Sequence, residues 1–131
     1  MLQKIPFVKM HGLGNDFVII DEHHMPKNSD IQSFVLKISD RELGIGCDQF
    51  IMYGQNSDKI NMAIYNQDGS TAKACGNASR CLTRLLFDQT GSKNIKLDIN
   101  GRIVSGEYFD KNIIKVDMGP PSFESDWMPD S

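Results

Sequence analysis

Apolar residues recur at helical spacing in two segments of the chain. In the first segment they occupy positions i, i+3, i+4 and i+7, which places them on one face of a helix. These positions are Ile31, Phe34, Val35 and Ile38. Ser29 or Asp30, just before them, can accept hydrogen bonds from the free backbone N–H groups of a first helical turn. The pattern predicts an amphipathic helix that begins at this cap.

The second helical pattern follows Cys75 and continues to about Gln89. Gly91 is a typical C-terminal cap because glycine readily adopts a positive φ. The apolar positions on one face of this helix are Ala78, Cys81, Leu82, Leu85 and Leu86. We expect that face to be buried and Cys81 to be an inert core residue.

Short β-forming runs separated by turn residues make up most of the remaining chain. In residues 59–65, Ile60, Met62 and Ile64 recur at every second position, which predicts a half-buried strand. Similar runs cover 5–10, 17–21, 49–53, 95–99, 103–109 and 113–118, with turns at 11–16, 44–46, 66–69, 100–101 and 110–112. Because strands outnumber helices, the sequence predicts an α+β fold with a mostly antiparallel sheet closing around at least one helix.

The length of 131 residues suits one domain with a modest core. We place that domain at residues 1–119. After Gly119-Pro120-Pro121 the sequence shows no periodicity, and residues 120–131 are typical of a linker or tail toward a segment that is not present.

Charge and cysteine content exclude several classes of protein. The net charge is −3 and the basic residues are scattered, which argues against a nucleic-acid partner. No run approaches the ~20 apolar residues of a membrane span, and the N-terminus lacks the pattern of a signal peptide. The three cysteines include no Cys-x-x-Cys pair, so a disulfide framework is not expected. We therefore predict a cytoplasmic protein with no nucleic-acid or membrane partner.

The segment Ala74-Cys75-Gly76-Asn77 places a thiol at the start of the second predicted helix. A helix N-terminus carries free N–H groups and about half a positive charge, which favours thiolate over thiol and lowers a cysteine pKa. The same N–H groups can bind a carboxylate or a phosphate. The arrangement suggests a catalytic cysteine beside an anion site. The simpler alternative is a small cysteine packed at a helix start.

Several motifs, in order along nearly the whole chain, resemble those of the diaminopimelate epimerase family. The first is Phe7-Val8-Lys9-Met10-His11-Gly12-Leu13-Gly14-Asn15-Asp16-Phe17, and the others are Gly44-Ile45-Gly46-Cys47-Asp48-Gln49, Tyr65-Asn66-Gln67-Asp68-Gly69-Ser70, Ala74-Cys75-Gly76-Asn77 and Val116-Asp117-Met118-Gly119. Cys47 and Ala78 depart from the family, which usually has a small residue such as Ala at the first position and Gly at the second. Cys47 therefore adds a thiol near the expected cleft.

The resemblance implies an enzyme that converts LL-diaminopimelate to the meso form without a cofactor, a step in the supply of lysine and cell-wall precursors. Members of the family have two pseudo-symmetric halves, each a strand barrel around a central helix, and each half supplies one cysteine. The resemblance therefore implies that this chain is the N-terminal half, with one half-site and no activity alone. Its expected partners are diaminopimelate and the C-terminal half, and a homodimer stays open.

The resemblance also assigns roles to individual residues. Cys75 is the expected catalytic base, and the backbone N–H groups of Gly76 and Asn77 are expected to bind the reacting carboxylate. Asn15, Gln49 and Asn66 match the substrate-contacting side chains of the family. Amide side chains suit this role, since each donates and accepts without adding a titratable charge. The alternative for Asn15 and Asn66 is ordinary turn chemistry.

Other candidate sites are weaker. His23 and His24 lack a cysteine or carboxylate at ligand spacing, so we predict no metal site. Gly12 and Gly14 lack the third glycine of a dinucleotide loop, and we expect no βαβ unit after them. Lys73 has no other feature of a pyridoxal site around it. The prediction is therefore an enzyme with no metal and no cofactor.

Two alternative functions stay open. Proline racemase-like isomerases share the architecture, but they usually carry His where this chain has Asn77, and they lack the first motif. A non-catalytic ligand-binding half-domain is the second alternative. A second cysteine-glycine motif in a downstream sequence would separate it from the enzyme.

Overall fold

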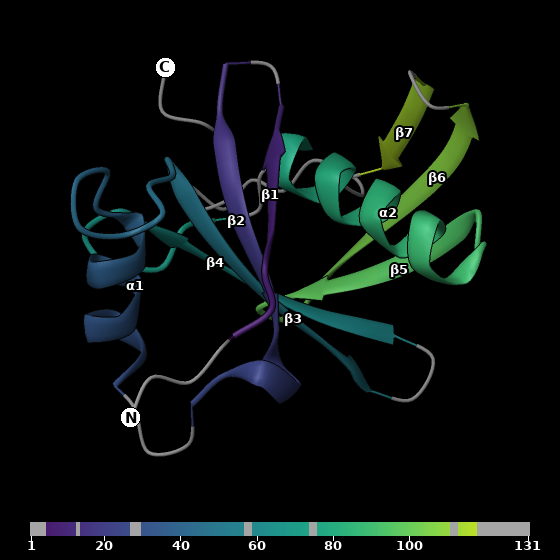
Figure 1. Cartoon of the computed structure of the whole chain (residues 1–131). Helices are drawn as coiled ribbons and strands as arrows, with labels where there is room; N and C mark the ends of the chain where they lie inside the picture. The colour runs from purple at the N-terminus through teal and green to yellow at the C-terminus, as the bar shows by residue number, and fades with distance from the viewer. Residues whose placement is uncertain are drawn as a thin grey trace, which may run out of the picture.

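The computed structural model describes residues 5–12, 14–26, 30–56, 59–73, 76–110 and 113–117. A single sheet, with its strands in chain order, runs through β1 (Val8–His11), β2 (Asp16–Asp21), β3 (Gln49–Asn56), β4 (Lys59–Asn66), β5 (Asn94–Ile99), β6 (Arg102–Asp110) and β7 (Ile113–Asp117). The helices are α1 (Ile31–Ser39), α2 (Gly76–Thr90) and a short 3-10 helix, η1 (Glu22–His24). The sheet curls into a half-barrel, as Figure 1 shows, and this confirms the predicted α+β class.

Most strand pairings are antiparallel, but β2 pairs with β3 and β4 pairs with β5 in parallel. Strands that run in the same direction need a crossover connection, and here each crossover contains a helix, α1 or α2. The expectation that no βαβ unit follows Gly12 and Gly14 is therefore wrong, because β2, α1 and β3 form one. Since β2 separates the glycines from α1, the unit still lacks the glycine-to-helix junction of a dinucleotide loop.

Helix α1 packs against one face of the sheet. Of the two predicted cap residues, Asp30 is the N-cap of α1. The Asp30 Oδ1 accepts from the backbone N–H of Gln32 at 3.2 Å. Val35 is fully buried, and Phe34 meets Phe50 of β3 edge-on with ring centroids 5.7 Å apart. The second hydrophobic cluster of the protein lies here, between α1 and the sheet.

Helix α2 packs against the opposite, concave face. All five apolar positions predicted for this helix are buried, and they contact the core side chains of β2 to β6. Phe17 and Ile19 of β2 belong to this core, whereas Val18 and Ile20 face α1. Strand β2 is therefore buried on both faces.

Element boundaries differ from the predictions by a few residues. Strand β1 begins at Val8, not at residue 5, and β3 continues to Asn56, because the β3–β4 hairpin pairs along its whole length. His11 pairs with Asp16, so the loop between β1 and β2 is shorter than predicted. The predicted cap Gly91 has a φ of 76° and donates its N–H to the Phe87 carbonyl at 2.7 Å, which confirms it.

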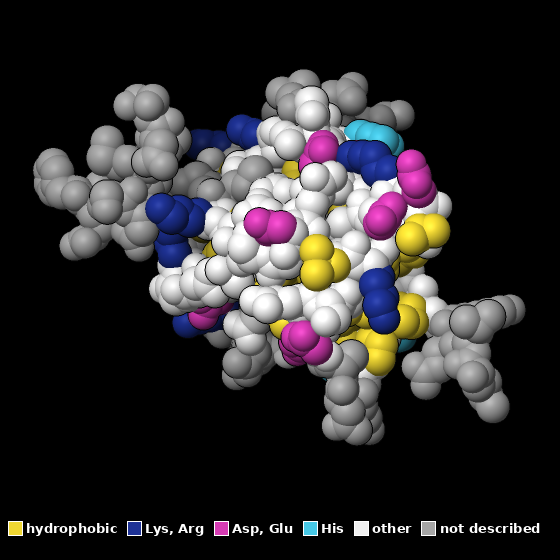
Figure 2. All heavy atoms as spheres, turned by 90° about the vertical axis from the view of Figure 1, so that its left-hand side faces the viewer, with side chains coloured by type: hydrophobic (Ala, Val, Ile, Leu, Met, Phe, Trp, Pro, Cys, Tyr) yellow, Lys and Arg dark blue, Asp and Glu magenta, His cyan; other side chains and the backbone are white. Residues whose placement is uncertain are grey.

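The surface over α1 and the neighbouring loops carries acidic and basic side chains interspersed, with no basic patch in the view of Figure 2. In the described part of the chain, no helix is both long enough and apolar enough to cross a membrane.

Candidate functional site

Strand register brings the predicted amide residues to one end of the sheet. Gln49, the first residue of β3, lies between Phe17 of β2 and Asn66, the last residue of β4. Asn15 immediately precedes β2 and therefore lies at the same end. Residues that are far apart in sequence thus lie close together, because β2 and β3 begin, and β4 ends, at the same end of the sheet.

Gln49 and Asn66 form the first pair of amides. The Gln49 Nε2 group donates to Asn66 Oδ1 at 3.3 Å, and Asn66 Nδ2 donates to the Ser70 hydroxyl at 3.1 Å. Gln49 Oε1 is buried without a hydrogen-bond partner among the described residues. An unpaired buried acceptor is costly, by about 1–3 kcal/mol, so this oxygen suits a ligand that donates.

Asn15 and Asn77 form the second pair. Asn77, on the first turn of α2, donates from Nδ2 to Asn15 Oδ1 at 3.3 Å, and Arg80 donates from Nη1 to Asn77 Oδ1 at 3.0 Å. A Cβ atom placed on Gly12 would lie 3.3 Å from Asn77 Cβ. The small glycine therefore lets the loop before β2 approach the start of α2 closely.

Helix α2 begins at Gly76, and the bond from Asn77 to Asn15 places the helix N-terminus, with its free N–H groups, beside Asn15. Gly76 and Asn77 are both partly buried. Cys75, the predicted catalytic residue, lies outside the described residues. The structure therefore brings together five of the six predicted site residues: Asn15, Gln49, Asn66, Gly76 and Asn77.

An ion-pair cluster next to Asn15 and Gln49 was not predicted from the sequence. Arg41 donates to both oxygens of Asp16, at 3.0 and 2.9 Å, and to Asp48 at 3.1 Å. The Asp16 carboxylate also accepts from the Asp48 backbone N–H at 2.8 Å, and Lys9 lies 3.5 Å away. The Arg41 guanidinium holds the pKa of Asp16 well below its usual range.

This cluster joins the start of β2 to the start of β3, and so holds the segments that carry Asn15 and Gln49. A signal for it was present in the sequence. Asp16 and Asp48 lie inside two of the motifs, directly after Asn15 and directly before Gln49. No sequence pattern pointed to Arg41. This residue lies in the loop that follows α1, and its contact with Asp16 forms only in the folded chain.

The other two cysteines lie in the core. Cys81 is buried on α2, as predicted. Cys47 is fully buried between α1 and the sheet, where its Sγ lies 3.5 Å from the Ser39 hydroxyl. The expectation that Cys47 adds a thiol near the cleft is wrong, because the chain enters β3 with this side chain turned into the α1 cluster. Burial also raises the pKa of the Cys47 thiol, which makes it a poor base.

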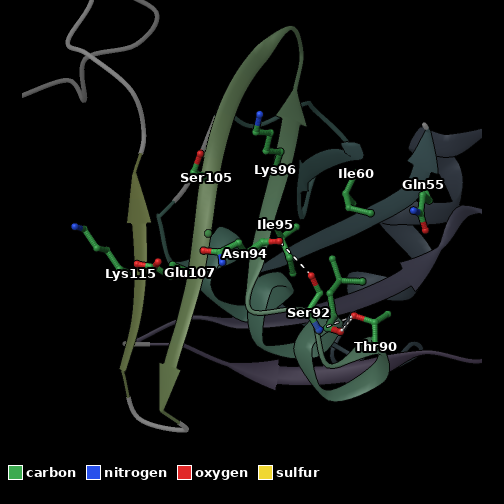
Figure 3. Close-up of a pocket in the computed structure, with 12 residues that line it drawn as sticks. Gln55, Ile60, Thr90, Ser92, Asn94, Ile95, Lys96, Ser105, Glu107 and Lys115 are labelled. Atoms are coloured by element: carbon green, nitrogen blue, oxygen red, sulfur yellow. Dashed lines mark hydrogen bonds between the residues drawn. The ribbon is translucent and has the colours of Figure 1, made fainter. Parts of the chain in front are cut away.

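A well-defined cavity of the described structure lies elsewhere. It has a volume of about 690 Å³ and lies at the end of α2 (Figure 3). Its lining includes Gln55 and Ile60 at the hairpin end of β3 and β4, opposite to Gln49 and Asn66. The cavity is therefore separate from the amide pairs.

No group of three or more His, Cys, Asp or Glu residues that could hold a metal ion occurs in the part of the chain that the structure describes. His23 and His24 are exposed on η1. The end of the sheet that carries Asn15, Gln49 and Asn66, called the amide end below, offers a set of hydrogen-bond donors and acceptors next to a helix N-terminus. That set can bind a small molecule that carries both an anionic and a cationic group.

Two structural comparisons support the fold. A methylitaconate-delta-isomerase matches with a TM-score of 0.64 at 14% identity, over 81% of this chain and 35% of that chain. A phenazine biosynthesis protein of the PhzF family from Enterococcus faecalis matches with a TM-score of 0.54 at 7% identity, over 74% of this chain and 35% of that chain. At such low identity the likeness concerns the fold alone.

Sequence comparisons are closer. A diaminopimelate epimerase of Rickettsia bellii (strain OSU 85-389) is 47% identical over 98% of this chain and 48% of its own length, and one of Rickettsia felis is 46% identical over the same shares. The chain thus spans about half the length of the curated relatives it matches, and the match is to their N-terminal half. A family model described as diaminopimelate epimerase matches residues 7–124. The chain therefore belongs to the diaminopimelate epimerase family.

Proposed function

We propose that this chain is the N-terminal half of an isomerase that interconverts LL- and meso-diaminopimelate without a cofactor. In this proposal the amide end of the sheet and the start of α2 form one of two half-sites. The C-terminal half would supply the other, and residues 120–131 would connect the two. The chain alone would then be inactive, and the complete enzyme would work in the cytoplasm.

The observation that carries the proposal is the meeting of the two amide pairs with the N-terminus of α2. An amino-acid head group has one carboxylate and one ammonium, so it needs donors and acceptors a few ångströms apart. Asn15, with its Nδ2 unpaired among the described residues, offers donors. Gln49 Oε1 offers an acceptor. The α2 N–H groups add a second place for a carboxylate.

The reaction inverts a carbon that carries a weakly acidic proton. In the proposed mechanism the Cys75 thiolate removes this proton from one face, and a thiol of the C-terminal half donates a proton to the opposite face. The electron pair left on carbon delocalises into the carboxylate. The free N–H groups at Gly76 and Asn77 would bind this carboxylate more strongly as its charge rises, which lowers the barrier.

The test replaces the N-terminal half of the Rickettsia bellii relative with this chain and measures conversion of LL- to meso-diaminopimelate. We expect the chimera to be active. Cys75→Ala should abolish turnover with the fold retained, and Cys75→Ser should nearly abolish it, since a hydroxyl is a far poorer base than a thiol. Asn66→Ala should mainly raise KM, by about tenfold, because a charged head group loses a partner.

Two controls make the result decisive. The unaltered relative shows that the assay works, and Cys47→Ala in the chimera should retain turnover, because the Cys47 thiol lies away from the amide end. Substantial turnover by the Cys75→Ala chimera would overturn the proposed role of this cysteine. An inactive chimera that is folded and binds no diaminopimelate would overturn the proposed function.

A further inference from the structure

The Gln49–Asn66 pair belongs to a chain of hydrogen bonds that ends on a carboxylate. Gln49 donates to Asn66, Asn66 donates to the Ser70 hydroxyl, and Ser70 donates to Asp68 Oδ1 at 2.6 Å. A carboxylate only accepts, so Asp68 determines the direction of every bond in this relay. The Ser70 hydroxyl and backbone N–H both donate to Asp68, and these bonds lower the pKa of its carboxyl.

The direction of this relay determines what Gln49 presents. Ser70 gives its proton to Asp68 and can therefore only accept from Asn66, which must turn its Nδ2 toward Ser70 and its Oδ1 toward Gln49. The opposite orientation of Gln49 would set two amide oxygens against each other. Gln49 must therefore use its Nε2 on Asn66, which leaves Oε1 as the buried and unpaired acceptor.

The Asn15–Asn77 pair belongs to a second relay, which starts from a cation. Arg80 donates to Asn77, and Asn77 donates to Asn15. A guanidinium only donates, so Asn77 must accept from Arg80 with its Oδ1 and direct its Nδ2 to Asn15. The Oδ1 of Asn15 is then used, and its Nδ2 is left to donate. The two relays thus end in opposite ways, one in an acceptor and one in donors.

We propose that Asp68 and Arg80 are positioning residues that determine which end of an amino-acid head group each amide binds. Through Ser70 and Asn66, Asp68 makes Gln49 an acceptor for the ammonium group. Through Asn77, Arg80 makes Asn15 a donor for the carboxylate. Neither residue needs to touch the ligand. This inference rests on the proposed function, since it takes diaminopimelate as the ligand.

The experiment uses the 131-residue chain labelled with nitrogen-15. The side-chain NH₂ signals of Asn15, Gln49 and Asn66 are followed by nuclear magnetic resonance during titration with LL-diaminopimelate. Pimelate, which has the two carboxylates but no amino groups, is the second probe. Asp68→Ala frees the Ser70 hydroxyl to donate to Asn66, so both amides can reverse.

Asp68→Ala should weaken diaminopimelate binding about tenfold and leave pimelate binding unchanged, because a hydrogen bond to a charged group is lost. Asp68→Asn should restore binding, since its Oδ1 still accepts from the Ser70 backbone N–H and hydroxyl. Arg80→Ala should weaken binding of both probes, and Arg80→Lys, which still only donates, should restore it. Asp40→Ala is the matched control, because Asp40 accepts backbone N–H groups in a turn outside both relays.

Equal affinity of Asp68→Ala and Asp40→Ala for diaminopimelate would overturn the inference, as would a loss in Asp68→Asn as large as that in Asp68→Ala. If the unaltered chain binds no diaminopimelate, the proposed function of the half-site fails instead. The relay is then tested by the spectra of the chain without ligand. There, Asp68→Ala must shift the NH₂ signals of Gln49 and Asn66, and unchanged signals would overturn the relay.

Discussion

Arg41 holds the carboxylate of Asp16 through two hydrogen bonds of 3.0 and 2.9 Å, and the Asp16 side chain is only 12% exposed. The pair connects the loop after α1 to the first residue of β2. Asp48 joins it through its own carboxylate and backbone N–H. The amide residues Asn15 and Gln49 each adjoin one of these aspartates, so the stability of the cluster and the geometry of the site are coupled.

We expect Asp16→Asn to destabilise the chain by about 2 kcal/mol at neutral pH, because the amide carries no charge and has only one acceptor oxygen for the two Arg41 donors. Arg41→Gln should cost less, since half of the Arg41 side chain is exposed to solvent. Urea unfolding followed by circular dichroism measures both. A cost of Asp16→Asn no larger than that of Asp40→Asn would contradict the importance of the cluster.

The same pair predicts a pH dependence of stability. The pKa of Asp16 is lower in the folded chain than in the unfolded chain, so its contribution is complete above the unfolded value and is lost as pH falls. The free energy of unfolding should therefore drop between about pH 5 and pH 2, and Asp16→Asn should flatten this drop. Parallel curves for the two proteins would show that Asp16 is not the group responsible.

Two buried glycines offer a matched test of packing. A Cβ on Gly106 of β6 would collide with the side chain of Thr83, which is buried on α2 and bonded to the Ser79 carbonyl. A Cβ on Gly54 would collide with Glu22, whose exposed side chain can swing away. Gly106→Ala should therefore cost about 1–3 kcal/mol, and Gly54→Ala clearly less. Equal melting temperatures for the two variants would contradict this packing of α2 on β6.

Thiol reactivity separates the three cysteines. Brief treatment with iodoacetamide at neutral pH should alkylate Cys75 first, because a helix N-terminus favours the thiolate. Cys47 and Cys81 are 0% and 6% exposed, and the pKa of Cys47 is raised by burial, so both should react slowly. Mass spectrometry of the digested protein assigns the sites. Preferential labelling of Cys81 would contradict both assignments.

Much of the fold could be predicted from the sequence because local patterns carried it. The five apolar positions of α2 and the alternation in β4 reported which faces are buried. The turn at Asn100 and Gly101, where φ is 54° and 87°, has the residues that a two-residue hairpin requires. The parallel pairing of β2 with β3 could not be predicted from local patterns, since it depends on how α1 returns the chain across the sheet.

The candidate site, like the fold, could be predicted only in part. Motif resemblance named Asn15, Gln49 and Asn66, and strand register explains why they meet. The direction of their hydrogen bonds depends on Asp68 and Arg80, whose contacts arise only in the folded chain. Cys47 was misplaced because a motif position says which residues lie near a site, but not which side of the strand each side chain takes.

Exchange of the α-proton of LL-diaminopimelate in deuterated water tests the two-half account most directly. The chain alone should not both exchange this proton and form the meso isomer, because inversion needs a second thiol on the opposite face of the substrate. The chimera with the C-terminal half of the Rickettsia bellii relative should do both. Exchange and inversion by the chain alone would contradict the account.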